Sequence, residues 1–158
     1  MKYIIREMQS KEYFLLDDFL YEAIFQRDEV NLLPKSIINK PELQIYVNKF
    51  GEKKDDYCLC VEVEGRVVGA VWVRNIKGYG CVDEITPEFA IALYKNFRGY
   101  GIGTKMMKKM LKYLKEVGYS KSSLAVQKDN YAVKMYLDVG FQIIDENKEE
   151  YIMVHYLK

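Results

Sequence analysis

Three glycines fall within five residues, at Gly99, Gly101 and Gly103, where a lysine-rich amphipathic segment begins. Glycine lets the backbone approach an anion closely, and the first turn of a helix offers unpaired N–H groups at the positive end of the helix dipole. The stretch therefore predicts a binding site for an anion, of which a phosphate is the natural example. A glycine-rich turn that only packs a helix against a sheet is the alternative.

Two well-known phosphate-binding designs do not match this spacing. A P-loop needs a lysine followed by serine or threonine, whereas Thr104 here precedes Lys105. A dinucleotide-binding fold needs G-x-G-x-x-G and an acid at the end of the next strand, but this chain has G-x-G-x-G and the strand-like run 122–127 ends without an acid. A third pattern, Arg/Gln-x-x-Gly-x-Gly/Ala, is satisfied by Arg98, Gly101 and Gly103.

Alternating and helical hydrophobic patterns divide the rest of the chain into short elements. Apolar residues at helical spacing predict helices, and β-branched or aromatic runs with turn residues between them predict strands. The expected strands are 2–6, two runs within 57–75, 88–94, 122–127, 141–145 and 151–158, and the expected helices are 13–24, 41–51, 102–117 and 130–139. Glu64 and Gly65 are the expected turn of a hairpin.

A second motif lies downstream of the glycines, in the sequence DNYAVKMYLDVGF, residues 129–141. Ala132, Tyr136, Gly140 and Phe141 of this stretch, together with the Arg-x-x-Gly-x-Gly loop, resemble the two recurring segments of the GNAT superfamily of acyl-CoA-dependent N-acetyltransferases. The order of elements is similar to that fold along the whole chain. The resemblance implies one α/β domain, residues 1–158, with a central mixed, mostly antiparallel sheet flanked by helices.

The resemblance also implies acetyl-CoA as co-substrate and assigns residues to its binding. Backbone N–H groups from Gly99 to Thr104 would hold the pyrophosphate, and Arg98 would add a charged contact. The strand end at Ile91, Ala92 and Leu93 would pair with the amides of the pantetheine arm. The residues of the loop itself are Gly99, Tyr100, Gly101, Ile102, Gly103 and Thr104.

The family's usual asparagine position before the downstream helix holds Asp129 here, and Asn130 follows one residue later. Both residue types cap helices, and we favour Asn130 as the one that meets the cofactor. Family members use a tyrosine at the position of Tyr136 to protonate the departing thiolate of CoA, and Tyr136 is the expected catalytic acid. Glu88 is the candidate base, since some family members place a glutamate on this strand.

The implied reaction is transfer of an acetyl group from acetyl-CoA to an amine by direct attack, without a metal or a covalent enzyme intermediate. The alternative is a non-catalytic acyl-CoA-binding or interaction module of the same fold. The acceptor is a small-molecule or peptide amine of unspecified identity. Acids in the first helical region can either recognise a cationic amine or form the polar face of a helix: Asp17, Asp18, Glu22, Asp28 and Glu29.

Composition excludes several other classes. With 24 basic and 23 acidic side chains in 158 residues the net charge is +1, so no overall field favours nucleic acid or an anionic membrane. Three cysteines, Cys58, Cys60 and Cys81, form neither a disulfide framework nor a zinc motif. No apolar run approaches the length of a membrane span. We expect a soluble cytoplasmic protein, and exposed strand edges in the closing hairpin suggest a possible homodimer.

Overall fold

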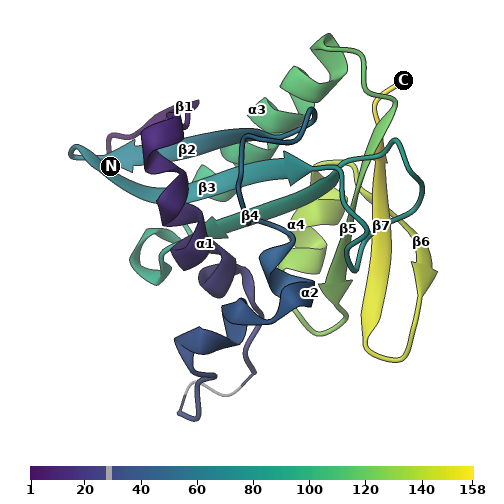
Figure 1. Cartoon of the computed structure of the whole chain (residues 1–158), viewed down its shortest axis with the longest axis horizontal. Helices are drawn as coiled ribbons and strands as arrows, with labels where there is room; N and C mark the ends of the chain where they lie inside the picture. Colours follow the sequence, from purple (N-terminus) through teal and green to yellow (C-terminus); the bar gives the residue numbers. More distant parts are fainter. Residues whose placement is uncertain (28–29) are drawn as a thin grey trace.

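The structure is a computed structural model that describes residues 1–27 and 30–158. The described residues form a seven-stranded sheet in the order β1-β2-β3-β4-β5-β7-β6 (Figure 1). All pairs within β1-β2-β3-β4 and within β5-β7-β6 are antiparallel. Only the pair β4–β5, where the two groups meet, is parallel. The strand bounds are β1 Ile4–Glu7, β2 Tyr57–Val63, β3 Arg66–Arg74, β4 Glu88–Leu93, β5 Lys121–Gln127, β6 Gln142–Glu146 and β7 Glu150–Tyr156.

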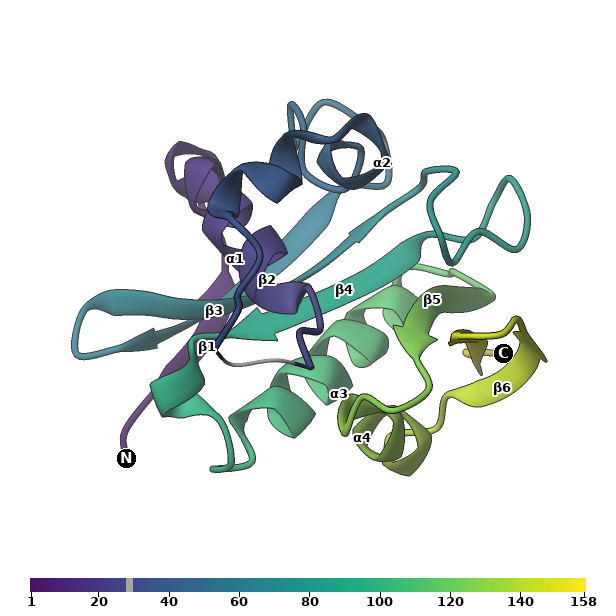
Figure 2. The same ribbon diagram turned by 90° about the horizontal axis from the view of Figure 1, so that it is seen from below.

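Helices cover both faces of this sheet (Figure 2). One face carries α1, Leu16–Ala23, and α2, Pro41–Gln44, and the other carries α3, Ile102–Glu116, and α4, Ala132–Asp138. Short 3₁₀ helices span Ser10–Leu15, Lys35–Asn39 and Lys95–Phe97. Each face has its own hydrophobic core, one built on α3 and one on α1 and the turns around α2. The mixed α/β sandwich predicted from the sequence is confirmed.

The helix α3 is amphipathic in the manner that its spacing predicts. Six residues along it are buried, namely Ile102, Met106, Met107, Met110, Leu111 and Leu114. Its lysines lie on the outer face, because a helix with an apolar stripe of this width buries that stripe and leaves the rest in water. Burial of Ile102 in the first turn fixes the start of the helix against the sheet. No helix among the described residues is both long and apolar enough to cross a membrane.

The strands β4 and β5 separate almost as soon as they meet. Their parallel ladder consists of a single residue pair, Glu88 with Ser123. Beyond that pair β4 runs toward the glycine loop while β5 turns away from it (Figure 2). Main-chain pairing between the two halves of the sheet therefore stops after Glu88, and the unpaired region between the rest of β4 and β5 is called the gap below.

Two early segments differ from the predicted helices. The helix predicted for 13–24 begins as the 3₁₀ helix Ser10–Leu15, where Glu12 and Gln9 form a capping box, and becomes α-helical only at Leu16. The helix predicted for 41–51 is α-helical only to Gln44 and continues as turns. The buried guanidinium of Arg74 donates hydrogen bonds to the carbonyls of Ile45 and Lys49 at 3.0 and 3.1 Å. This segment therefore follows a tertiary contact with β3 and not the regular path of a helix.

Candidate active site

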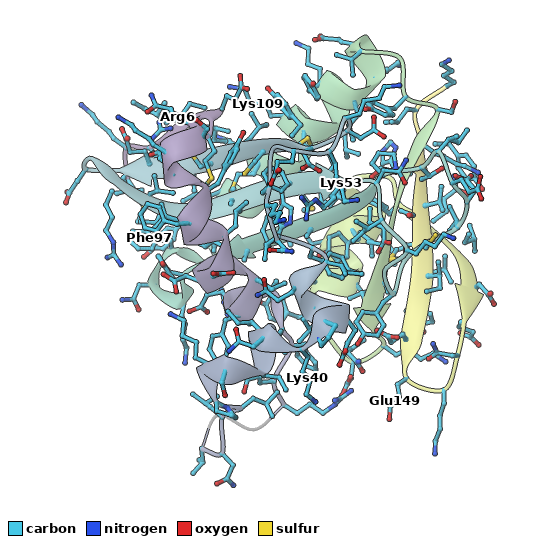
Figure 3. All side chains as sticks on the ribbon, viewed as in Figure 1. Arg6, Lys40, Lys53, Phe97, Lys109 and Glu149 are labelled. Atoms are coloured by element: carbon cyan, nitrogen blue, oxygen red, sulfur yellow. The ribbon has the colours of Figure 1, made fainter. Side chains whose placement is uncertain are left out.

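The glycine loop connects the 3₁₀ helix Lys95–Phe97 to α3. Gly99 and Gly101 have φ angles of 86° and 80°, in the left-handed region that favours glycine. Nothing lies within 4 Å of a Cβ added at either position, so the backbone conformation and not crowding requires glycine there. Phe97, at the start of this loop, lies on the opposite side of the molecule from Glu149 in the β6–β7 turn (Figure 3).

The loop offers a row of unpaired backbone donors. Among the described residues, no backbone N–H group from Gly99 to Thr104 donates a hydrogen bond to a carbonyl. The first bond of the helix runs from the Lys105 N–H to the Gly101 carbonyl at 3.3 Å. Gly99, Tyr100 and Gly101 are exposed. Exposed donors at the positive end of a 15-residue helix have the chemistry that an anion site requires, and binding of an anion there stays a prediction.

Gly103 has a different surrounding from the other two glycines. Its φ angle is not in the left-handed region, and a Cβ there would lie 3.6 Å from Met135 Sδ and 3.7 Å from Leu93 Cδ1. These are ordinary contacts, so a small side chain would fit. Gly103 thus lies where the first turn of α3 meets both β4 and α4, directly beside the gap in the sheet.

The register of β3 and β4 shows which backbone groups face that gap. The Tyr94 N–H donates to the Val68 carbonyl at 3.0 Å, so these opposed residues form a hydrogen-bonded pair. Such pairs alternate along an antiparallel ladder. Ala92 therefore bonds to β3, whereas Ile91 and Leu93 direct their N–H and C=O groups toward β5.

At Ile91 the strand β5 has already diverged, because the β4–β5 ladder ends at Glu88. The Leu93 carbonyl accepts a hydrogen bond from Arg98 Nε at 2.8 Å. Ile91 consequently has the backbone groups available to an extended ligand in the gap, in the way an added strand pairs with a sheet edge. Of the three residues predicted to contact pantetheine, Ile91 is the best placed.

Arg98 lies between the end of β4 and α1. Besides its bond to the Leu93 carbonyl, its Nη2 atom forms an ion pair with Glu22 Oε2 at 3.2 Å. About a third of each side chain is exposed. Its guanidinium is thus directed at α1 as well as at the strand end, and its predicted contact with the pyrophosphate stays a prediction.

Tyr136 lies in α4, on the same face of the sheet as the glycine loop. Its ring packs edge-on against Phe141, with 5.7 Å between centroids, and Phe141 packs in turn against Phe89 of β4 at 5.3 Å. This aromatic row connects α4 to β4. Among the described residues no hydrogen bond to the Tyr136 hydroxyl is found, and burial raises its pKa, so it stays protonated at neutral pH. A protonated, unpaired phenol beside the gap can donate a proton.

The two candidates at the start of α4 have separate partners. Asn130 Oδ1 accepts a hydrogen bond from the Ala132 N–H at 2.9 Å and so caps the helix. Asp129 forms an ion pair with Arg27, which follows α1, and Arg27 Nη2 lies 2.6 Å from Asp129 Oδ1. This hydrogen bond lowers the pKa of Asp129. Because Asp129 is already paired, Asn130 is the better placed of the two for the cofactor.

Glu88 lies at the start of β4, on the face that carries α1 and α2. Only 3% of it is exposed, and its carboxylate accepts three hydrogen bonds: from the Tyr46 hydroxyl at 2.8 Å, the Gly78 N–H at 2.7 Å and the Gly80 N–H at 2.9 Å. Burial raises the pKa of Glu88, while the three donors oppose that change. Glu88 is therefore a buried, fully held carboxylate at the apex of the gap.

Sequence reasoning missed the partners of Glu88. A Cβ at Gly78 would lie 2.4 Å from the Tyr46 hydroxyl, and one at Gly80 would lie 2.6 Å from the Leu124 carbonyl carbon, so both positions exclude any side chain. These glycines let the β3–β4 loop lie against Glu88 and β5. The spacing Gly-Tyr-Gly in this loop was the available signal. Tyr46 gave none, because it lies 42 residues away in sequence.

The remaining candidates lie outside the gap or are engaged. Lys105 Nζ lies 5.5 Å from the centre of the Tyr3 ring. The single histidine of the sequence, His155, is a packed residue, because its Nε2 atom lies 3.0 Å from the Val139 carbonyl and its ring packs against Phe141. Of the acids in the first helical region, Asp18 pairs with Lys35 and Glu22 with Arg98, and Asp17 is exposed. Asp28 and Glu29 lie outside the described residues.

Comparison with known proteins agrees with this geometry. A family model described as the acetyltransferase (GNAT) family matches residues 18–141. No curated protein matches the sequence at a significant level. Among solved structures, an acetyltransferase of the GNAT family from Streptococcus pneumoniae is 20% identical with a TM-score of 0.71, over 99% of this chain and 100% of that one.

Two further similar structures contain coenzyme A or acetyl-CoA. The PaiA N-acetyltransferase from Thermoplasma acidophilum in complex with coenzyme A is 16% identical, with a TM-score of 0.72 over 99% of both chains. YncA from Salmonella typhimurium, with its cofactor acetyl-CoA, is 14% identical with a TM-score of 0.66, over 99% of this chain and 94% of that one. Because the family model spans most of the sequence and the fold agrees along nearly all of it, this chain belongs to the GNAT family of acetyltransferases.

Proposed function

We propose that this protein is an N-acetyltransferase that carries the acetyl group of acetyl-CoA to an amine by direct attack. One observation carries the proposal: the row of unpaired N–H groups at the start of α3 lies at one end of the gap in which Ile91 offers free backbone groups. An anion site and an extended-chain site are thus joined. This arrangement suits a ligand that has a diphosphate at one end and an amide-containing arm at the other.

The residues of the gap fit acetyl-CoA in their chemistry. Exposed backbone donors from Gly99 to Thr104 suit a diphosphate, and the N–H and C=O groups of Ile91 suit the amides of pantetheine. The Asn130 amide N–H₂ group has no recorded partner among the described residues, since only Oδ1 is engaged in capping. When bound, acetyl-CoA supplies an acetyl group activated as a thioester.

Two residues on opposite faces of the sheet would move the protons. Tyr136, whose phenol is protonated and has no hydrogen-bond partner among the described residues, would donate a proton to the departing thiolate. Glu88 would accept the proton that the acceptor ammonium must lose before the neutral amine attacks, and it would do so through water because the carboxylate is buried. An acceptor that enters from the α1–α2 face meets Glu88 on its own side and Tyr136 across the gap.

Two of the three cysteines, Cys58 and Cys60, are unsuited to carry the acetyl group as a covalent intermediate. Cys58 and Cys60 are buried in β2, and burial raises the pKa of both thiols, that of Cys60 to about 11. A thiol is a nucleophile only as the thiolate, which these two do not form at neutral pH. Cys81 is exposed in the β3–β4 loop.

The test has two stages. Calorimetric titration of acetyl-CoA into the purified protein should give saturable binding with one site. Release of free thiol from acetyl-CoA should then require an added amine, and mass spectrometry should find the acetylated amine. Binding without amine-dependent release, across a panel of small amines, polyamines and peptides, would favour a non-catalytic acyl-CoA-binding module. A folded sample that does not bind acetyl-CoA would refute the proposal.

A further inference from the structure

Tyr46 follows α2 and is held by hydrogen bonds both at its backbone and at its side-chain hydroxyl. Its backbone carbonyl accepts a hydrogen bond from Trp72 Nε1 of β3 at 3.1 Å. Its hydroxyl donates to Glu88 Oε1 at 2.8 Å and accepts from the Tyr79 N–H at 2.9 Å. Burial, followed by the charge of Glu88, raises the pKa of this phenol, so it is a protonated donor at neutral pH.

The surroundings of Glu88 are built to hold an anion. Two N–H groups of one loop, from Gly78 and Gly80, converge on the carboxylate together with the Tyr46 hydroxyl. The loop can come this close only because both positions are glycine. Arg74 faces Glu88 from the directly opposed position of β3, but its guanidinium is bonded to the buried carboxylate of Asp56 at 3.0 and 3.1 Å. Hydrogen-bond donors, and not a paired cation, therefore stabilise the charge of Glu88.

The strand β5 contributes a free polar group at the same place. Ser123 is the residue paired with Glu88 where β4 and β5 meet, so both side chains lie on the α1–α2 face of the sheet. Its Oγ atom is buried and has no hydrogen-bond partner among the described residues. A buried hydroxyl beside a buried carboxylate at the apex of the gap is suited to hold a water that carries a proton.

From this arrangement we infer that Tyr46 is a positioning residue for proton transfer: it orients Glu88 and keeps it charged on the acceptor side of the gap. The inference rests on the proposed function for its kinetic consequence. Its physical content, the coupling of the Tyr46 hydroxyl to the charge of Glu88, is independent of any activity. A merely structural Tyr46 would only attach the turn after α2 to the sheet.

The variant Tyr46→Phe isolates the hydroxyl. Phenylalanine keeps the ring and the backbone bond to Trp72, so the fold should persist. The matched control is Tyr119→Phe, which removes another tyrosine hydroxyl bonded to a carboxylate, that of Asp55, away from the gap. A hydrogen bond to a charged group contributes a free energy that corresponds to a factor of roughly ten. At pH values below the titration midpoint of Glu88, kcat/KM for the amine should therefore fall roughly tenfold in Tyr46→Phe. The binding of acetyl-CoA should be unchanged in both variants.

The pH dependence separates positioning from structure. Loss of a donor to the carboxylate raises the pKa of Glu88, so the rising limb of the kcat/KM profile should move to higher pH in Tyr46→Phe and the rate should recover above it. Glu88→Gln should abolish that limb and so identifies it. A rate that falls equally at every pH in Tyr46→Phe, or an unmoved limb, would overturn the inference.

A spectroscopic readout decides the coupling without activity. Carbon-13 NMR can follow the titration of the glutamate carboxyl groups, with the Glu88 signal assigned through Glu88→Gln. The titration midpoint of Glu88 should be higher in Tyr46→Phe than in the unaltered protein, and it should be unchanged in Tyr119→Phe. If Tyr46→Phe does not fold, the Tyr46 hydroxyl proton of the unaltered protein should exchange slowly with water, and a rapidly exchanging proton would overturn the inference. An inactive unaltered protein with the expected NMR result would refute the proposed function alone.

Discussion

The two left-handed glycines that flank α3 allow the anion-site argument to be tested against an internal control. Gly101, before the helix, has φ = 80°, and Gly118, after it, has φ = 100°. Neither has any atom within 4 Å of an added Cβ. Alanine at either position therefore meets no clash and suffers only the left-handed backbone, which costs an L-residue about 1–2 kcal/mol.

Part of that cost is offset in the unfolded chain, because alanine has less conformational freedom to lose than glycine, an effect of about 0.4–1 kcal/mol. We expect each variant to lose about 1 kcal/mol of unfolding free energy, equivalent to a decrease in Tm of roughly 2–4 °C for a chain of this size. Thermal and urea unfolding measure this loss. The two variants should be similar in stability.

Their affinities for acetyl-CoA should differ. In Gly101→Ala the strained residue lies inside the row of unpaired N–H groups, so at least one donor turns away from the diphosphate. A hydrogen bond to a charged group contributes roughly 1.5–3 kcal/mol, so Kd should rise by about tenfold or more. In Gly118→Ala, at the far end of a 15-residue helix, Kd should be unchanged. Equal weakening in both variants would refute the assignment of the anion site to this loop, and unchanged stability in both would refute the strain argument.

Three further predictions follow from buried and paired groups. Tyr136→Phe should lower kcat by about 100-fold or more, as loss of a general acid does, with acetyl-CoA affinity within about twofold by calorimetry; an unchanged kcat removes it from the mechanism. Asp56→Asn leaves the buried Arg74 guanidinium without its partner, so urea unfolding should show a loss of about 3–5 kcal/mol, and a loss below about 1 kcal/mol would contradict the burial argument. The hydrogen bond from Arg6 lowers the pKa of Glu12 from 4.5 to about 2, so its contribution to stability is complete above pH 4.5 and disappears as the pH falls toward 2. Glu12→Gln should therefore destabilise the protein at pH 7 and flatten the acid limb of a stability profile, and an unaltered limb would exclude this pair as its cause.

Periodicity and turn chemistry were sufficient for the parts of the fold that local sequence determines. The turn at Glu64 and Gly65 has φ angles of 52° and 79°, as a hairpin with two left-handed residues requires, and the strands on either side pair as predicted. The glycine loop and α3 also follow from local rules. The conformation of each of these elements depends on residues that are close together in sequence.

Contacts between distant segments could not be read in this way. The turn after α2 depends on Arg74 and Asp56, which lie in or next to strands of the sheet, and period-2 patterning does not reveal that Arg74 is directed inward. Likewise Glu88 was predicted as a candidate base from its place on a strand, but its three donors come from a loop and from Tyr46. The residues that tune the candidate site are those whose partners the chain order separates.

The single residue pair between β4 and β5 has a mechanical consequence. Through it the β1–β4 half and the β5–β7–β6 half of the sheet share one rung of main-chain pairing, supplemented by the bonds of Ser122 and Ser123 to the Pro87 carbonyl at 2.9 and 3.1 Å. Because so little main-chain pairing joins the halves, we expect amide hydrogens at this junction to exchange faster than those within either half. A ligand that pairs with the unpaired edge of β4 would join the two halves. Its binding would then slow amide hydrogen exchange in strands that the ligand does not contact.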